Sequence, residues 1–322
     1  MASVPLDKSA LSQWIKEQAL EAGFLTVGLT KVVTLDDETA RLKAWLDKGF
    51  HGEMQYLANH FDLRKDPRLL VDGAKSVICL SFNYYPEEAS LSTTAPKISR
   101  YAYGRDYHKV VKKKMINLLK ELQVVKPELK GRALVDSAPV MEREWAKRAG
   151  LGWVGKNTLI IHPKKGSYFF LGVIIIDQEL DYDEPVSDHC GTCTRCIDAC
   201  PTEAIAPDGY VLDATKCISY ATIELKSDEL PKAFDGKLEG WAFGCDICQE
   251  VCPWNKFSEP HTEADFLPSE AIKEMTKEGW DNLTQEEFET LFFGTPVKRT
   301  GYAGMKRNIT AADIKTETGE DV

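Results

Sequence analysis

Residues 190–201 read CGTCTRCIDACP, and this cysteine motif decides how the middle of the chain folds. Its four cysteines are separated by two, two and three residues, and a proline follows the fourth. In proteins with two 4Fe–4S clusters, this spacing turns three thiolates toward one cluster and the fourth toward the neighbouring cluster. The motif therefore predicts a two-cluster, electron-transferring iron–sulfur domain.

A second, incomplete copy of the motif lies at residues 244–253, GCDICQEVCP. Its first ligand is missing, because Ala242 stands three residues before Cys245, and Cys217 is the available substitute. The crossing rule then assigns two ligand sets, set one with Cys190, Cys193, Cys196 and Cys252, and set two with Cys200, Cys217, Cys245 and Cys248. Two structural zinc sites would use the same ligands, but the Cys-Pro endings favour clusters. With four thiolates each, both clusters are expected to carry electrons and not to bind substrate.

The composition is that of a folded protein, and its cysteines suit a reducing compartment. The chain has 322 residues, of which 43% are hydrophobic and nine are cysteines. No apolar run reaches the ~18 residues of a membrane span, and no signal peptide precedes the first predicted helix, so we expect a cytoplasmic location. Cytosolic cysteines are more often metal ligands than disulfides. The ninth, Cys79, lies in the apolar run SVICLSF (76–82) and is expected to be a core residue.

The charge is unevenly distributed along the chain. The net charge is -10, yet residues 97–165 contain 17 Lys and Arg against 6 Asp and Glu, so that this stretch is +11 and the remainder -21. Such a polarised molecule is able to present a basic face to a nucleic-acid backbone. An equally acceptable interpretation is a solvated helix face with scattered lysines.

Strands and helices alternate through residue 178, which favours an α/β or α+β layer architecture. Apolar periodicity predicts helices over residues 8–23, 35–48, 108–122 and 140–149, and strands over 24–29, 76–82, 133–135 and 169–176. Composition divides the chain into a leading α/β domain (1–180), a cysteine-rich domain (181–257) and an acidic helical segment (258–322).

Two polar features of the leading domain are candidates for chemistry. Asp136 follows the short strand 133–135, where a carboxyl group whose pKa is raised by burial would act as an acid. A turn or helix cap explains Asp136 equally well. The glycine-rich loop 150–157 matches no known phosphate-binding motif and suits the close approach of backbone to a large ligand.

Several long motifs together resemble one family, the epoxyqueuosine reductases of tRNA modification. They are RYAYGRDYH (100–108), VDSAPVMEREWAKRAGLGWVGKN (135–157), CGTCTRCIDACPTEAI (190–205), CISYATIE (217–224), GCDICQEVCPWN (244–255) and FFGTPVKRTGYAGMKRN (292–308). The resemblance covers nearly the whole chain. It implies an α+β protein, with a nitroreductase-like cobalamin-binding domain followed by a ferredoxin-like two-cluster domain and a short helical C-terminal segment.

The resemblance also implies an activity. The family reduces epoxyqueuosine to queuosine in the anticodon loop of tRNA, with cobalamin as nucleophile or electron relay to the epoxide and the two clusters as electron conduit. The partners would be tRNA and an external low-potential electron donor, with no membrane. The family's general acid falls on Asp136.

Further residues are implied by the same resemblance. The corrinoid would be bordered by Trp153, Gly155, Lys156, Asn157, Ser219, Tyr220 and Thr222. The run Asp106-Tyr107-His108 begins like a corrinoid-binding signature, but Val111 takes the place of its glycine, so we interpret His108 as a helix-end residue and expect base-off cobalamin without a protein ligand. Candidate tRNA contacts are Lys112, Lys113, Lys114, Arg143, Lys147, Arg148, Lys298, Arg299, Lys306 and Arg307.

Two other functions use the same motifs. One is a different corrinoid reductase, such as a dehalogenase, which turnover of halogenated substrates would reveal. The other is a non-catalytic two-cluster electron carrier, against which the long leading domain with Asp136 argues.

Overall fold

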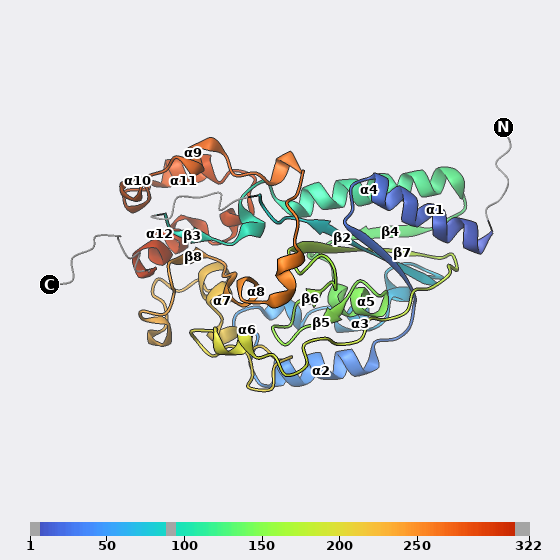
Figure 1. Cartoon of the computed structure of the whole chain (residues 1–322), viewed down its shortest axis with the longest axis horizontal. Coiled ribbons are helices and arrows are strands. Elements are labelled where there is room, and N and C mark those ends of the chain that lie inside the picture. The colour runs from blue at the N-terminus through green and yellow to red at the C-terminus, as the bar shows by residue number, and fades with distance from the viewer. Residues whose placement is uncertain (1–6, 88–94, 313–322) are drawn as a thin grey trace.

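A four-stranded antiparallel sheet forms the centre of the first half of the chain (Figure 1). The computed structural model describes residues 7–87 and 95–312. The strand order is β1 (Thr26–Lys31), β2 (Ser76–Asn83), β7 (Phe169–Ile176) and β4 (Gly131–Leu134). The two eight-residue strands β2 and β7 are central and almost entirely buried. The sheet therefore has the near-continuous apolar strands expected when both faces are covered.

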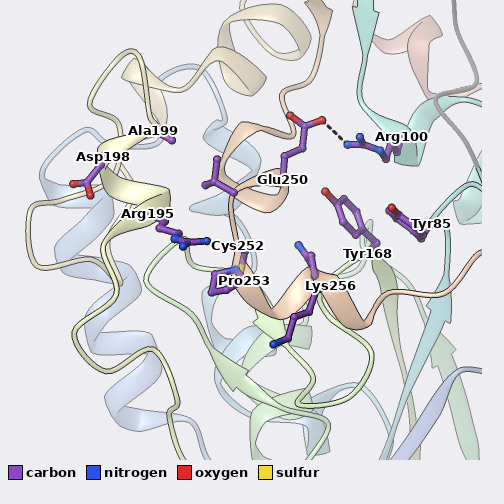
Figure 2. Close-up of a pocket in the computed structure, with 12 residues that line it drawn as sticks. Tyr85, Arg100, Tyr168, Arg195, Asp198, Ala199, Glu250, Cys252, Pro253 and Lys256 are labelled. Carbon is purple, nitrogen blue, oxygen red and sulfur yellow. Dashed lines mark hydrogen bonds and ion pairs between the residues drawn. The ribbon is translucent and has the colours of Figure 1, made fainter.

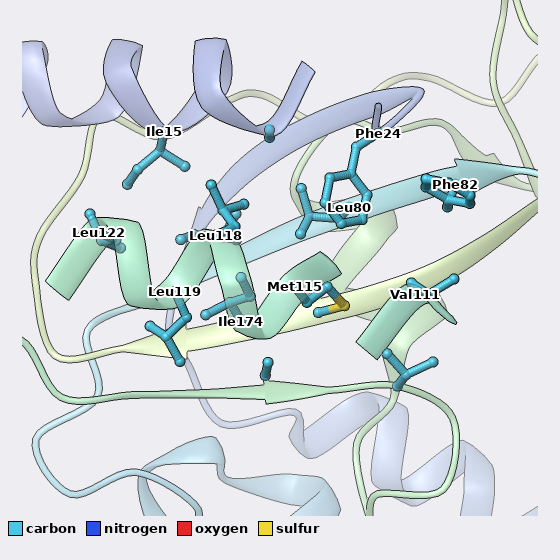
Figure 3. Close-up of a cluster of buried hydrophobic side chains, with 14 of the residues drawn as sticks. Ile15, Phe24, Leu80, Phe82, Val111, Met115, Leu118, Leu119, Leu122 and Ile174 are labelled. Carbon is cyan, nitrogen blue, oxygen red and sulfur yellow. The ribbon is translucent and has the colours of Figure 1, made fainter. Parts of the chain in front are cut away.

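Successive side chains of a strand point to opposite faces of the sheet. Since nearly every position of β2 and β7 is buried, both faces are covered. Helices α1 (Lys8–Glu21) and α4 (Tyr107–Val125) cover one face, where Leu80 and Ile174 pack against them (Figure 3). Helix α5 (Glu142–Arg148) covers the other face, where Cys79 is fully buried in the second hydrophobic cluster. Burial raises the pKa of the Cys79 thiol well above its usual range, which suits a core residue.

Shorter elements complete the first half of the chain. They are α2 (Asp36–Asp47), η1 (Gln55–Leu57), α3 (Phe61–Lys65), η2 (Pro67–Leu69), β3 (Lys97–Ile98), η3 (Arg100–Ala102), β5 (Trp153–Val154) and β6 (Ile160–Ile161).

The cysteine-rich region has short helices and one short strand. Its elements are α6 (Arg195–Asp198), η4 (Ala214–Lys216), α7 (Ile218–Ile223), η5 (Lys232–Phe234), β8 (Trp241–Phe243), α8 (Ile247–Glu250) and η6 (Pro253–Phe257). The C-terminal segment is helical and comprises η7 (Ala264–Phe266), α9 (Glu270–Lys273), α10 (Lys277–Asp281), α11 (Gln285–Leu291), η8 (Pro296–Arg299) and α12 (Gly301–Ala311). Its last ten residues, 313–322, lie outside the described residues.

The three predicted regions share their cores. Strand β3 pairs in parallel with β8, and Ile98 is buried in one cluster with Trp280 and Phe288. Conversely, Phe266 of the C-terminal segment packs into the core of the sheet. The buried Asn308 amide donates to carbonyl oxygens of α7 and β8, at 2.8 Å each. The predicted boundaries at 180 and 257 thus mark changes in composition, while the hydrophobic cores continue across them.

The predicted long elements are confirmed with shifts of a few residues at their ends. The first strand begins at Thr26 because Phe24 donates its N–H to the end of α1, at Ala19 O. The strands of two or three residues were not predicted, since they are too short to show a period. No helix among the described residues is long and apolar enough to cross a membrane.

We predict that Gly28→Ala destabilises the sheet domain by roughly 1–3 kcal/mol, a typical cost of overpacking. A Cβ atom at Gly28 would lie 2.0 Å from the backbone oxygen of Ala149, at the end of α5. The measurement is the midpoint of urea unfolding, compared with Lys31→Ala at the exposed end of the same strand. Equal midpoints for the two variants would contradict the tight contact between β1 and α5.

Candidate active site

Asp136 lies in a tight turn directly after the edge strand β4. Its φ of 47° is in the left-handed region, which costs a non-glycine residue about 1–2 kcal/mol. The Ser137 N–H donates to Val135 O at 2.6 Å and tightens the turn. The Asp136 side chain is 61% exposed, so the turn presents its carboxylate away from the core.

Two residues at the start of α4 bind this carboxylate, and a third holds one of them. Asp136 Oδ2 accepts hydrogen bonds from His108 Nε2 at 2.8 Å and from the Tyr107 hydroxyl at 2.9 Å. The other ring nitrogen, His108 Nδ1, lies 2.7 Å from Asp106 Oδ1. Because ionised carboxylates only accept hydrogen bonds, an imidazole between two of them is satisfied when both ring nitrogens carry protons.

The charges of these groups follow from the same contacts. Burial would lower the pKa of His108, but the hydrogen bonds to Asp106 and Asp136 raise it to about 9. Desolvation would raise the pKa of Asp136, yet the hydrogen bond and charge of His108 hold it below its ordinary value. The condition set for Asp136 as an acid, a pKa raised by burial, is therefore not met, because the contact with His108 outweighs the effect of burial. At neutral pH the proton is on His108 and the carboxylate is ionised.

Glu142, the first residue of α5, adds a second proton nearby. Its Oε1 atom is buried and has no hydrogen-bond partner among the described residues. Burial raises the pKa of Glu142 to about 8, and the negative charge of Asp136 adds to the rise. The Glu142 carboxyl group is therefore mainly protonated at neutral pH, whereas Asp136 is not.

Residues from distant segments complete this site. The positive charge of Arg299, in η8, contributes to the lowered pKa of Asp136. The Arg299 guanidinium donates to Glu224 Oε2 at 2.8 Å and lies 5.5 Å from the centre of the Tyr56 ring. Burial raises the pKa of Tyr56 to about 12. The site thus combines the end of β4, the start of α4, the segment after α7, and η8.

The cysteines of set one surround a common space. A small cavity is lined by all four of them, together with Lys156, Asn157 and Trp254. Trp153 Nε1 donates to the Cys190 sulfur at 3.4 Å. Four thiols from two separate segments are thus arranged around one volume.

The cysteines of set two also lie close together. Burial raises the pKa of the Cys245 and Cys248 thiols, and the neighbouring Cys217 adds to both rises. Cys200 interacts with Cys217 and Cys245 in the same way, and its sulfur accepts the Ala204 N–H at 3.3 Å. Across residues 7–87 and 95–312, no three His, Cys, Asp or Glu side chains converge closely enough to hold a single metal ion.

Most of the polar groups expected to border a corrinoid are bonded within the protein. Lys156 Nζ donates to Gly191 O and Cys193 O at 2.8 and 3.1 Å, and Asn157 Nδ2 donates to Cys248 O at 3.2 Å. The loop 153–157, which includes Gly155, therefore holds both cysteine motifs against the sheet domain. Its contact with a corrinoid stays a prediction.

The same is true of the expected residues in α7. The Tyr220 hydroxyl accepts the Glu53 N–H at 2.9 Å. The fully buried Thr222 hydroxyl donates to Ile218 O and accepts the Gly244 N–H, at 2.8 and 2.9 Å. Ser219 lies in the same helix, which begins directly after the set-two ligand Cys217. A corrinoid contact for these three residues is likewise untested.

The predicted basic residues fall into two groups. Exposed residues with no ion-pair partner in the described part of the chain are Lys112, Lys113 and Lys147. Residues engaged with protein groups are Lys114 with Glu263, Arg143 with Thr158 O, Arg148 with Glu38, Lys298 with Glu289, Arg299 with Glu224, and Lys306 with Asp281 O.

Arg307 makes the most hydrogen bonds within the protein of this second group. Its guanidinium donates to three carbonyl oxygens, those of Ala221, Leu225 and Ser227, at 3.0, 3.1 and 2.6 Å. Burial also lowers its pKa. Arg307 thus stabilises the chain around the end of α7, and its contact with tRNA stays a prediction.

Sequence reasoning missed the roles of His108 and Glu142. The expected helix end at His108 is the start of α4, and its contact with Asp136 joins residues 28 positions apart. The Asp106-Tyr107-His108 run was a usable signal. Asp106 caps the helix, and side chains in a helix point toward its N-terminus, so His108 reaches beyond the start of α4. Nothing in the sequence indicates that Glu142 Oε1 is buried without a partner.

Comparison with known proteins gives one consistent result. Residues 189–255 match the family "4Fe-4S double cluster binding domain", and residues 64–137 match "Epoxyqueuosine reductase QueG, DUF1730". The chain is 53% identical over 302 residues to the epoxyqueuosine reductase of Cellulophaga algicola, covering 94% of this chain and 98% of the relative.

Solved structures agree with this match. One shows epoxyqueuosine reductase with an epoxyqueuosine-modified stem loop of tRNA-Tyr; it is 30% identical, with a TM-score of 0.84 and coverage of 94% of this chain and 80% of the other. A second, from Bacillus subtilis, has its catalytic loop swung out of the active site; it is 29% identical, with a TM-score of 0.85 and the same coverage.

We predict that His108→Gln lowers stability in a pH-dependent way. A folded-state pKa of about 9, above the ordinary value of 6.5, means that His108 stabilises the fold fully below about pH 6.5 and loses this contribution as the pH rises through about 9. The difference in unfolding temperature between wild type and variant should be largest near pH 6 and should vanish above about pH 9.5. A difference that is constant across this range would show that His108 is not charged in the pair.

We predict that Cys252→Ala loses the iron of one cluster while Cys79→Ala retains all of it. Cys252 lines the set-one cavity, whereas Cys79 is buried in the sheet core. The measurement is iron and sulfide per chain after anaerobic reconstitution, with the visible absorbance as a second readout. Full iron content in Cys252→Ala would remove it as a ligand.

Proposed function

Because the chain belongs to the epoxyqueuosine reductase family, we propose that it reduces epoxyqueuosine to queuosine in the anticodon loop of tRNA. The observation that carries this proposal is the similarity to reductases over more than nine-tenths of the chain, including a relative solved with its modified tRNA stem loop. The chain is an oxidoreductase with a two-cluster iron–sulfur domain. Asp136 and its neighbours supply and relay the protons that the reaction consumes.

The two cysteine sets fit two 4Fe–4S clusters. Four thiols spread around one cavity suit a cluster, whose irons each take a separate thiolate, better than a single zinc ion, around which the thiolates would converge. We assign Cys190, Cys193, Cys196 and Cys252 to one cluster and Cys200, Cys217, Cys245 and Cys248 to the other. When bound, the clusters supply single electrons along a fixed path.

The family also implies cobalamin, and the surroundings of Asp136 fit a large ligand with amide groups. Three buried polar atoms in the segments near Asp136 have no partner among the described residues, namely Glu142 Oε1, His51 Nδ1 and Thr300 Oγ1. Thr300 directly follows Arg299, and His51 precedes the Glu53 amide that bonds Tyr220. When bound, cobalamin supplies the nucleophilic electron pair for attack on the epoxide.

The reaction requires two protons as well as two electrons. Opening the epoxide places one proton on its oxygen, and loss of that oxygen as water takes a second. The structure holds two proton sources at this point, the His108 imidazolium and the Glu142 carboxyl group. The first proton passes from His108 Nε2 through Asp136 Oδ2, since these two atoms already share a hydrogen bond.

The strained turn at Asp136 also suits this role. A residue held in the left-handed region persists only where its surroundings over-determine it, and here the hydrogen bonds from Tyr107 and His108 do so. The corresponding part of the molecule moves in a relative, whose catalytic loop is swung out of the active site. Loss of the His108 contact is therefore expected to release the turn.

The tRNA would approach the side of the molecule on which Asp136 is exposed. Arg299 is beside Asp136, and the Lys112 and Lys113 side chains extend from the helix that begins at Tyr107. Lys147 and Arg143 lie on α5, which begins at Glu142. Lys298 precedes Arg299 in η8. In this proposal these cations supply the salt-dependent attraction for the tRNA phosphates.

The test is anaerobic turnover of epoxyqueuosine-containing tRNA with reconstituted protein, cobalamin and a strong chemical reductant. Mass analysis of the nucleosides should show loss of one oxygen from the modified base, dependent on cobalamin. Absence of that loss in protein with both clusters and bound corrinoid would contradict the proposed substrate.

We predict that Asp136→Asn retains clusters and corrinoid but loses at least 100-fold in turnover, a typical contribution of a general acid. An amide at this position cannot relay the proton of His108. The matched control is Asp72→Asn, which alters an exposed carboxylate away from the turn and from both cysteine sets. Turnover by Asp136→Asn at the wild-type rate would remove Asp136 from the chemistry.

A further inference from the structure

A groove of about 900 Å³ lies on the side of the cluster domain, separate from the Asp136 site. We call it the Cys252 groove. One wall comes from the cluster domain through Arg195, Cys252, Pro253 and Lys256, and the other comes from the sheet domain through Tyr85 and Tyr168 (Figure 2). None of these groups takes part in the proton chemistry at Asp136.

The groove reaches a set-one cysteine from the surface. Cys252 is part of its lining, and Arg195 directly precedes Cys196. Set two lies on the side of the Asp136 site, because α7 begins directly after Cys217 and is followed by Glu224, the partner of Arg299. Set one is thus the outer set and set two the inner one.

The charges of the groove leave unpaired cations beside Cys252. Glu250 is neutralised by Arg100 at 2.7 Å. Arg195 and Lys256 are exposed and form no ion pair with any residue in ranges 7–87 and 95–312, although Lys256 Nζ lies 4.8 Å from the Phe257 ring centre. Asp198 is the remaining acidic group, and its carboxylate accepts the Thr194 hydroxyl at 2.7 Å. Arg100 also pairs with Asp246 at 3.3 Å, so the exposed and unpaired positive charge of the groove is that of Arg195 and Lys256, on a chain whose net charge is -10.

The composition of the surface is that of a protein interface. Tyrosine and arginine are enriched at such interfaces, and the groove combines the partly exposed Tyr85 with the exposed Arg195, while Tyr168 is buried beneath them. The neighbouring Phe257 is 39% exposed and adds apolar surface beside Lys256. Exposed apolar and cationic groups around a redox ligand suit a transient contact with another protein.

We propose that the Cys252 groove is the docking surface for an acidic one-electron carrier protein. The proposal rests on the proposed function, in which two electrons per turnover come from outside. In each encounter the carrier loses one electron and the outer cluster gains it, so that one turnover takes two encounters. Opposite charges steer the carrier to this groove.

The test measures the rate at which a reduced, acidic plant-type 2Fe–2S ferredoxin reduces the clusters of the reconstituted holoprotein. Stopped-flow absorbance follows the bleaching of the clusters under anaerobic conditions. Arg195→Glu combined with Lys256→Glu should slow this rate at least tenfold at low salt, the scale of electrostatic steering. Arg195→Gln combined with Lys256→Gln should give a smaller loss and a weaker salt dependence.

The control is Lys31→Glu combined with Lys75→Glu, which changes the net charge by the same amount. Both lysines are exposed: Lys31 ends β1, and Lys75 directly precedes Ser76, the β2 residue paired with Lys31, at the end of β2 opposite to Tyr85. This variant should be reduced at nearly the wild-type rate. A wild-type rate in the groove variants, or an equal loss in the control, would overturn the docking surface.

Reduction by dithionite, a small reductant that needs no docking, separates the remaining outcomes. It should be equally fast in all variants. If the groove variants are slow with dithionite as well, the changes act on the cluster and the docking proposal fails. If wild-type protein accepts electrons from ferredoxin but leaves epoxyqueuosine-containing tRNA unchanged, the docking surface stands and the proposed function fails.

Discussion

The contact between the loop 153–157 and the two cysteine motifs is the constraint on which the rest of the molecule depends. Trp153 donates to the Cys190 sulfur, Lys156 to the carbonyls of the first motif, and Asn157 to the Cys248 carbonyl of the second. One short loop of the sheet domain therefore positions both ligand sets. Since these groups are buried or half-buried, breaking a contact would leave polar atoms without partners, which costs more than the bond contributes.

The acid–base site depends on charge distribution more than on shape. Two carboxylates share the His108 ring, so that the proton is held by the imidazole and Asp136 stays ionised in its strained turn. Glu142, only six residues further along the chain, holds its proton instead, because burial raises the pKa of its carboxyl group to about 8 and leaves Oε1 without a partner among the described residues. A reaction that consumes two protons is thus matched by two groups that hold one each at neutral pH.

The Asp136 site and the Cys252 groove have different residues. The Asp136 site combines the end of β4 with η8, where Arg299 lies close enough to lower the pKa of Asp136. The Cys252 groove is lined by Cys252 of set one and by the loops around it. In the proposed function, a bound nucleic acid and an electron carrier would therefore use different surfaces.

Sequence alone predicted the features that are encoded locally. The cysteine spacing lies within short segments, the long strands are continuous apolar runs, and Asp136 follows a strand within a few residues. The tertiary structure decided what depends on distant segments. It places His108 against Asp136, Arg299 beside the same site, and Arg307 on carbonyl oxygens. It also places Ile98 and Phe266 in hydrophobic cores outside their predicted domains. The direction of the Asp136 pKa belongs to this second group, because desolvation and neighbouring charges depend on three-dimensional distance and not on position in the chain.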